Sequence, residues 1–235
     1  MRTLYLCGGG NPEGVRLALR VNEVEKRWDR IVLLDDDPAK HGREFMGVPC
    51  IGGFGVLAEA DPKRSWVANL VARTTVRRWR ARNKIASYGL PFARLVDPEV
   101  DTSGAELATD VIVYRYATIG PEARIADGCC VFMGAVVGHE AILERGCVVA
   151  PNAAINARVH LGEGVYVGSC AAILPEVEIG AWATVGACSM VVQRIEAGET
   201  VMGVPGRALK LRAKVPPDLG TPQPEPAGRG ESQER

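Results

Sequence analysis

The amino-acid sequence predicts a small α/β domain followed by a parallel β-helix. Residues 1–100 alternate between strand-like and helix-like segments, and an unbroken six-residue repeat of aliphatic residues follows them. The chain ends in proline-rich polar sequence without periodicity. We therefore expect an α/β, Rossmann-like domain over residues 1–100, an all-β β-helix over residues 101–212 and a disordered tail over residues 213–235.

The chain opens with a predicted β-α-β unit. "RTLYLCGGG" predicts a buried strand and a glycine turn, "EGVRLALRVNEVEKRW" has apolar residues at helical spacing, and "DRIVLLDDDP" predicts a second strand that ends in three aspartates. The glycine loop thus follows the first strand, where open α/β sheets bind ligands. Gly8, Gly10 and Gly14 miss the GxGxxG spacing by one residue, so this is a weak dinucleotide fingerprint. The loop is either a phosphate-binding site for a nucleotide or phosphosugar, or a plain structural turn.

Three further segments complete the predicted α/β domain. "SWVANLV" predicts a third strand, "TTVRRWRARNKIASYG" a helix, and "LPFARLV" the last stretch before the repeats. We expect the arginines of that helix to form a solvated face.

The six-residue repeat begins at Ile119. Thirteen aliphatic residues follow one another at this spacing: Ile119, Ile125, Val131, Val137, Leu143, Val149, Ile155, Leu161, Val167, Ile173, Ile179, Val185 and Val191. Two residues before each stands a small or β-branched one: Ala117, Ala123, Cys129, Ala135, Ala141, Cys147, Ala153, Val159, Val165, Ala171, Val177, Ala183 and Ser189. Neither a helix nor a lone strand has this period.

A six-residue period is typical of a parallel β-helix, in which three hexads close one triangular coil. The aliphatic residue points inward and stacks on the residue one coil later, while the small residue lies inside near a corner. Glycine often follows the aliphatic position, as at Gly120, Gly138, Gly162, Gly168, Gly180 and Gly186. The alternative is a Val/Ala-rich β-sandwich that matches the register by coincidence. Cys129 and Cys147 occupy the small inward position and are predicted to pack there, whereas Cys130, Cys170 and Cys188 receive no role.

The composition narrows the class of protein. With 28 basic and 28 acidic residues in 235, net charge gives no attraction to nucleic acid or acidic membranes. No apolar run reaches the ~20 residues of a membrane span, and "MRTLYLCGGG" lacks the shape of a signal peptide. The seven cysteines form no CxxC pair, which argues against a disulfide framework and against a metal site. We expect a reduced cytoplasmic enzyme with no nucleic-acid or membrane partner.

The two domains, the "GHE" at Gly138–Glu140 and the closing "GVPGR" together resemble the bacterial sugar acyltransferases. These include sialic acid O-acetyltransferases and the N-acetyltransferases of UDP-bacillosamine and GDP-perosamine synthesis. The likeness extends from Met1 to about Arg212. It implies a left-handed β-helix, a nucleotide-linked sugar bound by the N-terminal domain, and acetyl-CoA lying along the β-helix between neighbouring subunits of a homotrimer.

The resemblance also implies roles for residues. Gly8, Gly9, Gly10, Asn11, Asp35 and Asp36 match the nucleotide-binding segments in position. His139 matches the general base and Glu140 the acidic residue beside it. The residues expected near CoA are Gly203, Pro205 and Arg207 of "GVPGR", together with Gly168 and Gly186. No metal is expected.

Histidine suits general-base chemistry because its unperturbed pKa of about 6.5 lets it accept a proton near neutrality. A carboxylate can fix its tautomer and stabilise the imidazolium, which Glu140 can do only if the turn folds the two side chains together. One coil beyond His139 lies Ala157, whose backbone N–H we expect to donate to the thioester oxygen. The alternative is that His139 is a solvent-facing turn residue. His160 is expected to face outward, and His41 is a candidate ligand contact.

The sequence departs from the family at three places. Phe132 stands where an asparagine is common, Val148 where some members have a second histidine, and the first loop reads "GGGNPEG" rather than G-x-x-G-H-G. We expect an acetyl-CoA-dependent N-acetyltransferase acting on an amino group of a nucleotide-linked sugar. The alternatives are a sialic acid type O-acetyltransferase and a non-catalytic hexapeptide-repeat binding protein. Two other classes fit the sequence poorly. A γ-type carbonic anhydrase would need three histidines around zinc, but only His139 and His160 lie in the repeats. A sugar nucleotidyltransferase would need an early "G-x-G-T-R", which "CGGGNPEG" lacks.

Overall fold

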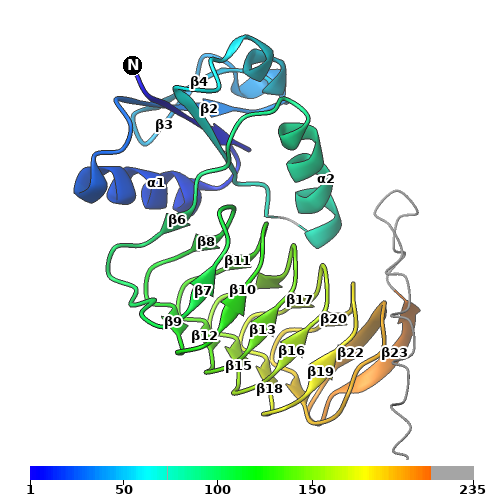
Figure 1. Cartoon of the computed structure of the whole chain (residues 1–235). Coiled ribbons are helices and arrows are strands. Elements are labelled where there is room, and N and C mark those ends of the chain that lie inside the picture. Colours follow the sequence, from blue (N-terminus) through cyan, green and yellow to red (C-terminus); the bar gives the residue numbers. More distant parts are fainter. Residues whose placement is uncertain (73, 213–235) are drawn as a thin grey trace, which may run out of the picture.

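The computed structural model describes residues 1–72 and 74–212 (Figure 1). An α/β domain sits at one side of a long β-helix. Helices α1 (Pro12–Glu25) and α2 (Thr75–Ala86) lie on either side of the sheet of this α/β domain. The predicted tail of residues 213–235 lies outside the described residues. Within the described residues, no helix is both long and apolar enough to cross a membrane.

The N-terminal domain is built on a five-stranded sheet. Its order is β3 (Glu44–Phe45), β4 (Val48–Gly52), β2 (Arg30–Leu34), β1 (Thr3–Cys7) and β5 (Ser65–Asn69). Strands β4, β2, β1 and β5 are parallel, whereas β3 is antiparallel to β4. Two 3₁₀ turns, η1 (Pro38–Lys40) and η2 (Phe54–Glu59), follow β2 and β4.

The two helices cover opposite faces of this sheet. Because side chains alternate along a strand, Leu4 and Leu6 of β1 pack with α1, while Cys7 packs in the cluster that contains Ile85 of α2. The predicted β-α-β unit is therefore present, and the glycine loop follows β1 directly.

The second domain winds into a three-sided coil. The face that meets the N-terminal domain is called the covered face. Its strands are β6 (Leu95–Val96), β8 (Ile112–Val113), β11 (Cys130–Val131), β14 (Val148–Val149), β17 (Tyr166–Val167), β20 (Thr184–Val185), β22 (Glu199–Met202) and β23 (Arg207–Arg212). Strand β6 lies before residue 100, yet it pairs with β8 of the coil.

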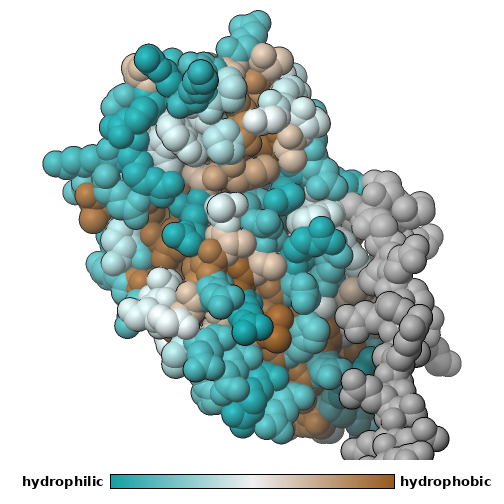
Figure 2. Space-filling model, viewed as in Figure 1, coloured by the Kyte–Doolittle hydropathy of each residue, from teal (hydrophilic) through white to brown (hydrophobic). Residues whose placement is uncertain are grey.

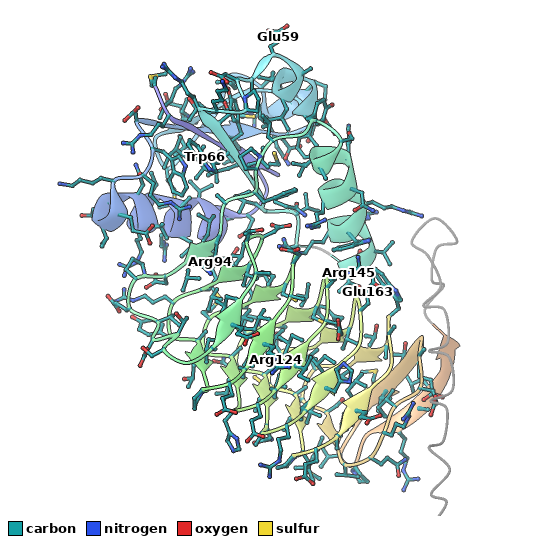
Figure 3. All side chains as sticks on the ribbon, in the orientation of Figure 1. Glu59, Trp66, Arg94, Arg124, Arg145 and Glu163 are labelled. Carbon is teal, nitrogen blue, oxygen red and sulfur yellow. The ribbon has the colours of Figure 1, made fainter. Side chains whose placement is uncertain are left out.

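The other two faces differ in chemistry. The apolar face consists of β9 (Thr118–Ile119), β12 (Val136–Val137), β15 (Ala154–Ile155), β18 (Ala172–Ile173) and β21 (Met190–Val191). The charged face consists of β7 (Glu106–Leu107), β10 (Arg124–Ile125), β13 (Ile142–Leu143), β16 (His160–Leu161) and β19 (Glu178–Ile179). The first residue of each strand points outward, which puts small and apolar residues on the apolar face and mainly charged ones on the charged face. Figure 2 shows hydrophilic side chains over the lower part of the β-helix, and Figure 3 labels Arg124 of β10.

The predicted register holds from Ile119 to Val191. Over this stretch each strand pairs in parallel with the strand 18 residues later, as Val137 does with Ile155. Beyond it the spacing shortens, and Val185 pairs with Val201, 16 residues later. All twenty-six predicted inward residues are buried, with at most 8% of any of them exposed. Glycines follow the aliphatic position because the next coil comes very close: a Cβ on Gly138 would lie 2.7 Å from the backbone nitrogen of Ala157.

Helix α2 joins the two domains, and the expected solvated face of arginines is only partly present: Arg77 and Arg80 are exposed, but Arg78 and Arg82 are not. Arg78 is only 1% exposed, and its guanidinium donates to the carbonyl oxygens of Gly128 (3.0 Å) and Asn69 (2.7 Å). Arg82 forms an ion pair of 2.6 Å with the buried carboxylate of Asp110. These two arginines face the β-helix rather than solvent. Trp79 between them packs over Gly128 and Gly146, whose missing side chains make room for its ring.

Candidate active site

The side chains of His139 and Glu140 meet at a corner of the β-helix. Glu140 has a left-handed backbone (φ 58°), which turns its carboxylate back so that Oε1 lies 2.9 Å from Nδ1 of His139. The two side chains are 49% and 44% exposed. Within the described residues Nε2 of His139 has no hydrogen-bond partner, so this nitrogen is open to an incoming group. The expected His-Glu contact is thus formed, and the ring lies outside the inward positions.

A second contact ties this carboxylate to the next coil. Arg158 stands one coil after Glu140, and its Nη1 lies 3.4 Å from the same Oε1 atom. Its Nε lies 3.0 Å from Oε1 of Glu176, which is one coil further on. The corner therefore has a ladder in which Arg158 bridges two carboxylates. Sequence reasoning did not identify Arg158, although the regular one-coil spacing of these three residues was visible.

Ala157 lies beneath the histidine, as its position one coil later predicted. Its carbonyl accepts a hydrogen bond from Glu176 N–H at 3.0 Å, but its own N–H donates to no acceptor in residues 1–72 and 74–212. Its neighbour Asn156, by contrast, donates its N–H to Ile173 within the sheet. Because Gly138 above it has no side chain, the Ala157 N–H remains a free donor beside the imidazole corner.

The glycine loop lines a separate cavity of about 750 Å³. Its lining includes Gly8, Gly10, Asn11 and Asp35, as expected for a ligand-binding loop, together with Lys40, Arg77 and Phe132. The two cations were not singled out in the sequence, because a lysine in a short loop and one arginine in a run have no distinctive pattern. His139 is not among the described residues that line this cavity.

The acidic end of β2 is held in place by the loop around it. Oδ2 of Asp35 accepts from the Gly9 N–H (2.7 Å) and from Nζ of Lys40 (2.6 Å). Burial would raise the pKa of Asp35, but Lys40 and the backbone N–H groups of Asp37 and Gly9 outweigh it and hold this pKa below its usual range. The carboxylate is therefore ionised at neutral pH, which positions the lysine at the cavity. His41 contacts the backbone of the same aspartate, with Nε2 2.8 Å from the Asp35 carbonyl oxygen.

Asp36 and Asn11 have partners within the protein. Asp36 pairs with Nζ of Lys84 at 2.7 Å and lines a smaller neighbouring cavity of about 320 Å³. Burial opposes ionisation of Asp36, but Lys84 and the N–H of Phe54 keep its pKa low. Asn11 caps α1 by accepting from the Gly14 N–H, and its amide donates to the Tyr114 hydroxyl at 2.9 Å. Asn11 thus links the glycine loop to the β-helix.

The departures from the family have structural explanations. The ring of Phe132 stacks on Tyr114 with 4.8 Å between centroids and 9° between planes, and it forms a wall of the glycine-loop cavity. Val148 is buried in the hydrophobic cluster between the two domains. Phe132 thus puts an apolar ring at the cavity wall, where the resemblance leads one to expect an asparagine. Val148, which stands in place of a second histidine, is part of the hydrophobic core.

The residues expected near CoA gather at one place. Gly168 and Gly186 lie one coil apart at the corner between the covered and apolar faces, which is called the glycine edge. Met202 packs where a side chain on Gly186 would stand, and it leads into the turn that contains Gly203 and Pro205 and ends at Arg207, the first residue of β23. The turn is fixed to the last coil, since Gly203 N–H donates to the Ser189 hydroxyl at 3.0 Å. Phe132 lies on the same edge two coils earlier, so the glycine-loop cavity and the expected CoA residues share it.

Within one chain, His139 lies on a different edge of the β-helix from the residues expected near CoA. His139 and Glu140 occupy the corner between the apolar and charged faces, which is called the histidine edge. The apolar face separates this edge from the glycine edge. His160 lies on the charged face, with Nε2 3.4 Å from Oε1 of Glu144. No group of three or more metal-ligating side chains occurs in the part of the chain that the structure describes.

No protein-family model matches the sequence, and no curated protein matches it either. Solved structures do match. The acetyltransferase domain of PglB from Neisseria gonorrhoeae FA1090, in complex with acetyl coenzyme A, superposes with a TM-score of 0.81 at 24% identity over 88% of this chain and 99% of that one. PerB from Caulobacter crescentus, in complex with CoA and GDP-perosamine, gives 0.76 at 25% identity over 89% and 98%. WeeI from Acinetobacter baumannii AYE gives 0.78 at 18% identity over 89% and 100%.

These matches span both domains of the present chain, and nearly the whole of each matched protein. The chain therefore has the fold of the hexapeptide-repeat sugar acyltransferases that its sequence resembles.

Proposed function

We propose that this protein is an acetyl-CoA-dependent N-acetyltransferase acting on an amino group of a nucleotide-linked sugar. The proposal rests above all on the His139–Glu140 pair, in which the carboxylate holds one ring nitrogen and leaves the other free. The structures of PglB with acetyl coenzyme A and of PerB with CoA and GDP-perosamine support the same substrate classes. GDP-perosamine joins an amino sugar to a nucleotide, which favours N-acetylation over the sialic acid type of O-acetylation.

In the proposed reaction the sugar nitrogen attacks the thioester carbonyl carbon. Nε2 of His139 accepts the proton that the nitrogen loses, and Glu140 stabilises the resulting imidazolium through Nδ1. The oxygen of the tetrahedral intermediate becomes negative and accepts from the free Ala157 N–H. The C–S bond then breaks, the imidazolium of His139 returns its proton to the departing sulfur so that CoA leaves as its thiol, and the product is the N-acetyl sugar.

The glycine-loop cavity is the proposed nucleotide site. Gly8 and Gly10 line it just before α1, and Lys40 and Arg77 supply positive charge for a diphosphate. Gly9 contributes indirectly, because its N–H holds the carboxylate of Asp35. Asp35 and Asp36 act mainly by positioning Lys40 and Lys84. A nucleotide that binds the folded protein must raise its melting temperature, so a thermal-shift screen of UDP-, GDP- and dTDP-linked amino sugars would identify the base.

A homotrimer would bring the two edges together. Suppose that three triangular prisms turn the same face toward a common axis. That face is bounded by two edges, and the first edge of each prism then lies beside the second edge of the next prism. If that face is the apolar one, the histidine edge of one subunit meets the glycine edge of its neighbour. The outward residues Thr118, Val136, Ala154, Ala172 and Met190 suit a buried interface, and Leu174 and Val192 at the histidine edge are 37% and 43% exposed in the single chain. CoA would lie between neighbours, near Gly168, Gly186 and the Gly203–Arg207 turn.

We also propose that the protein works in the cytoplasm. All seven cysteines are free, as is usual for proteins of a reducing compartment.

Replacing the general base tests the function directly. His139→Ala should reduce kcat by at least about a hundredfold, since general-base assistance accounts for ~10²- to 10⁴-fold of a rate. Thiol release from acetyl-CoA in the presence of the amino sugar selected by the thermal screen measures this rate. His160→Ala is the matched control, because that histidine lies on the charged face, and it should retain wild-type turnover.

A His139→Ala variant with near-normal turnover would refute the assignment. A wild-type protein that binds no acetyl-CoA by calorimetry would favour the non-catalytic binding protein instead. Turnover with free sialic acids, but with none of the amino sugars, would favour the O-acetyltransferase.

A further inference from the structure

Two exposed cysteines occupy equivalent positions in successive coils of the glycine edge. Cys170 and Cys188 stand one coil apart, and the strands just before them pair Val167 with Val185. The backbone N–H of Cys188 donates to the carbonyl oxygen of Ser169, the residue before Cys170, at 2.9 Å. Both thiols are free and exposed, whereas the other five cysteines are buried. The surface of the single chain thus presents this pair of thiols and no other.

The backbone puts the two side chains within bridging reach. Cys170 and Cys188 both have left-handed backbones, with φ of 58° and 57°, so their Cβ atoms point the same way from equivalent turns. Parallel strands in one sheet lie ~4.8 Å apart, and stacked turns follow the same spacing. Disulfides join Cα atoms about 4.4–6.8 Å apart. A bond between the two sulfurs therefore requires only side-chain rotation and a small shift of the turns.

The buried pair Cys129 and Cys147 shows what distinguishes the exposed one. These two residues also stand one coil apart, but they point inward, and their thiols donate to the carbonyl oxygens of Glu144 and Gly162 at 3.0 and 3.2 Å. Burial, and then the contact with Cys129, raises the pKa of Cys147 well above its usual range. Because the thiolate is the reactive form, Cys147 is unreactive, and burial keeps reagents away from both residues. The same stacking at the surface leaves Cys170 and Cys188 accessible to reagents.

We propose that Cys170 and Cys188 form a dithiol site that reacts as a unit with disulfides of small thiols. The thiolate of one cysteine attacks the small disulfide, forms a mixed disulfide and releases one small thiol. The thiolate of the other then attacks the protein sulfur of that mixed disulfide and releases the second small thiol. In total two protein S–H groups become one S–S bond, and the small disulfide is reduced to two thiols.

The location links this chemistry to the proposed function. Cys170 and Cys188 each follow by two residues a glycine expected near CoA, Gly168 and Gly186. If the proposed function holds, the disulfide of CoA is the small disulfide brought to this edge, and the bridge would clamp together the two coils along which acetyl-CoA lies. This link rests on the proposed function, whereas the dithiol chemistry itself does not.

Titration with 5,5′-dithiobis(2-nitrobenzoate) on the native full-length protein tests the proposal. With one equivalent of reagent per chain, the wild type should release two equivalents of thionitrobenzoate and retain no adduct. Cys170→Ser and Cys188→Ser should each release one equivalent and retain one adduct, a twofold difference. Mass spectrometry of the wild type should find a peptide cross-link between residues 170 and 188 within one chain. His139→Ala should behave as the wild type, so a failed acetyltransferase assignment would leave this result unchanged.

Three results would overturn the proposal: retained adducts on the wild type after release of only one equivalent, a disulfide that joins two chains, or thiols that do not react in the native protein. A denatured sample serves as the reference for total thiols.

Discussion

At the residue scale, the corner of His139 depends on one arginine. Oε1 of Glu140 is shared between the imidazole at 2.9 Å and the guanidinium of Arg158 at 3.4 Å. Arg158 touches no reacting atom in the proposed mechanism and is a positioning residue. It fixes the carboxylate and, through its charge, weakens the attraction of that carboxylate for an imidazolium.

Arg158→Gln should therefore lower kcat about two- to fivefold, because exposed ion pairs contribute ~0.2–1 kcal/mol. KM should stay unchanged, and Arg158→Lys should recover part of the loss. Steady-state kinetics at neutral pH measure kcat and KM of both variants. Full kcat in Arg158→Gln would show that Arg158 has no role beyond the surface.

Much of the candidate site could be predicted from the sequence at this scale. A histidine beside a carboxylate was visible in "GHE", and the three-hexad coil pointed to Ala157. The predicted sites lie on two different edges, and this also follows from the three-hexad coil. Gly138 and Gly168 are five hexads apart, which is not a multiple of three, so they occupy different corners. Lys40 and Arg77 were missed because only the folded loop brings them to the cavity.

At the element scale, α2 fastens the N-terminal domain to the coil through buried charge. Asp110 is 1% exposed, and one of its oxygens lacks a partner among the described residues. Burial raises the pKa of Asp110 to about 6, although Arg78 and Arg82 oppose it. Because this folded-state pKa lies above that of an unfolded aspartate, ~3.9, the folded state binds more protons between those values. This group's contribution to the free energy of unfolding therefore falls as pH rises from about 4 to about 6 and stays constant above.

Arg82→Met should lower the free energy of unfolding by ~3 kcal/mol at pH 8, where it leaves a buried carboxylate without its partner. The loss should be smaller at pH 5, where Asp110 is protonated, and the added change Asp110→Asn should recover part of it. Urea denaturation at both pH values gives these numbers. Arg124→Met on the charged face is the control and should change stability by less than ~0.5 kcal/mol. Equal losses at pH 5 and 8 would contradict the buried ion pair.

The helix itself was predictable, but its buried face was not. The apolar and charged pattern of "TTVRRWRARNKIASYG" has arginines on every side, and only packing against Gly128 and Gly146 decides which of them are buried. The coil is the opposite case. Its side chains repeat with a fixed period, so each strand's neighbours follow from counting, and all twenty-six inward positions predicted by the repeat are buried. Ile195 and Val201 also lie in this core, but they follow the end of the repeat and were not predicted.

At the scale of the whole molecule, the apolar face is the interface of the proposed trimer. Ala172 lies at its centre line between Ala154 and Met190. Ala172→Glu should convert the proposed trimer into monomers and abolish turnover, because three carboxylates would be buried without partners. Light scattering after size-exclusion chromatography measures the mass. Ile142→Glu makes the same kind of change on the charged face and should leave the trimer intact. A wild-type monomer at micromolar concentration, or a trimeric Ala172→Glu, would refute this interface.

The last strand limits growth along the other direction. Every strand of the coil up to β22 adds in parallel, and such a stack could in principle continue from one molecule into another as a fibre. Strand β23 lies antiparallel on β22, with Val201 opposite Ala208. A second molecule would meet a strand of reversed direction at this border, so the parallel stacking of one coil on the next ends with the chain itself.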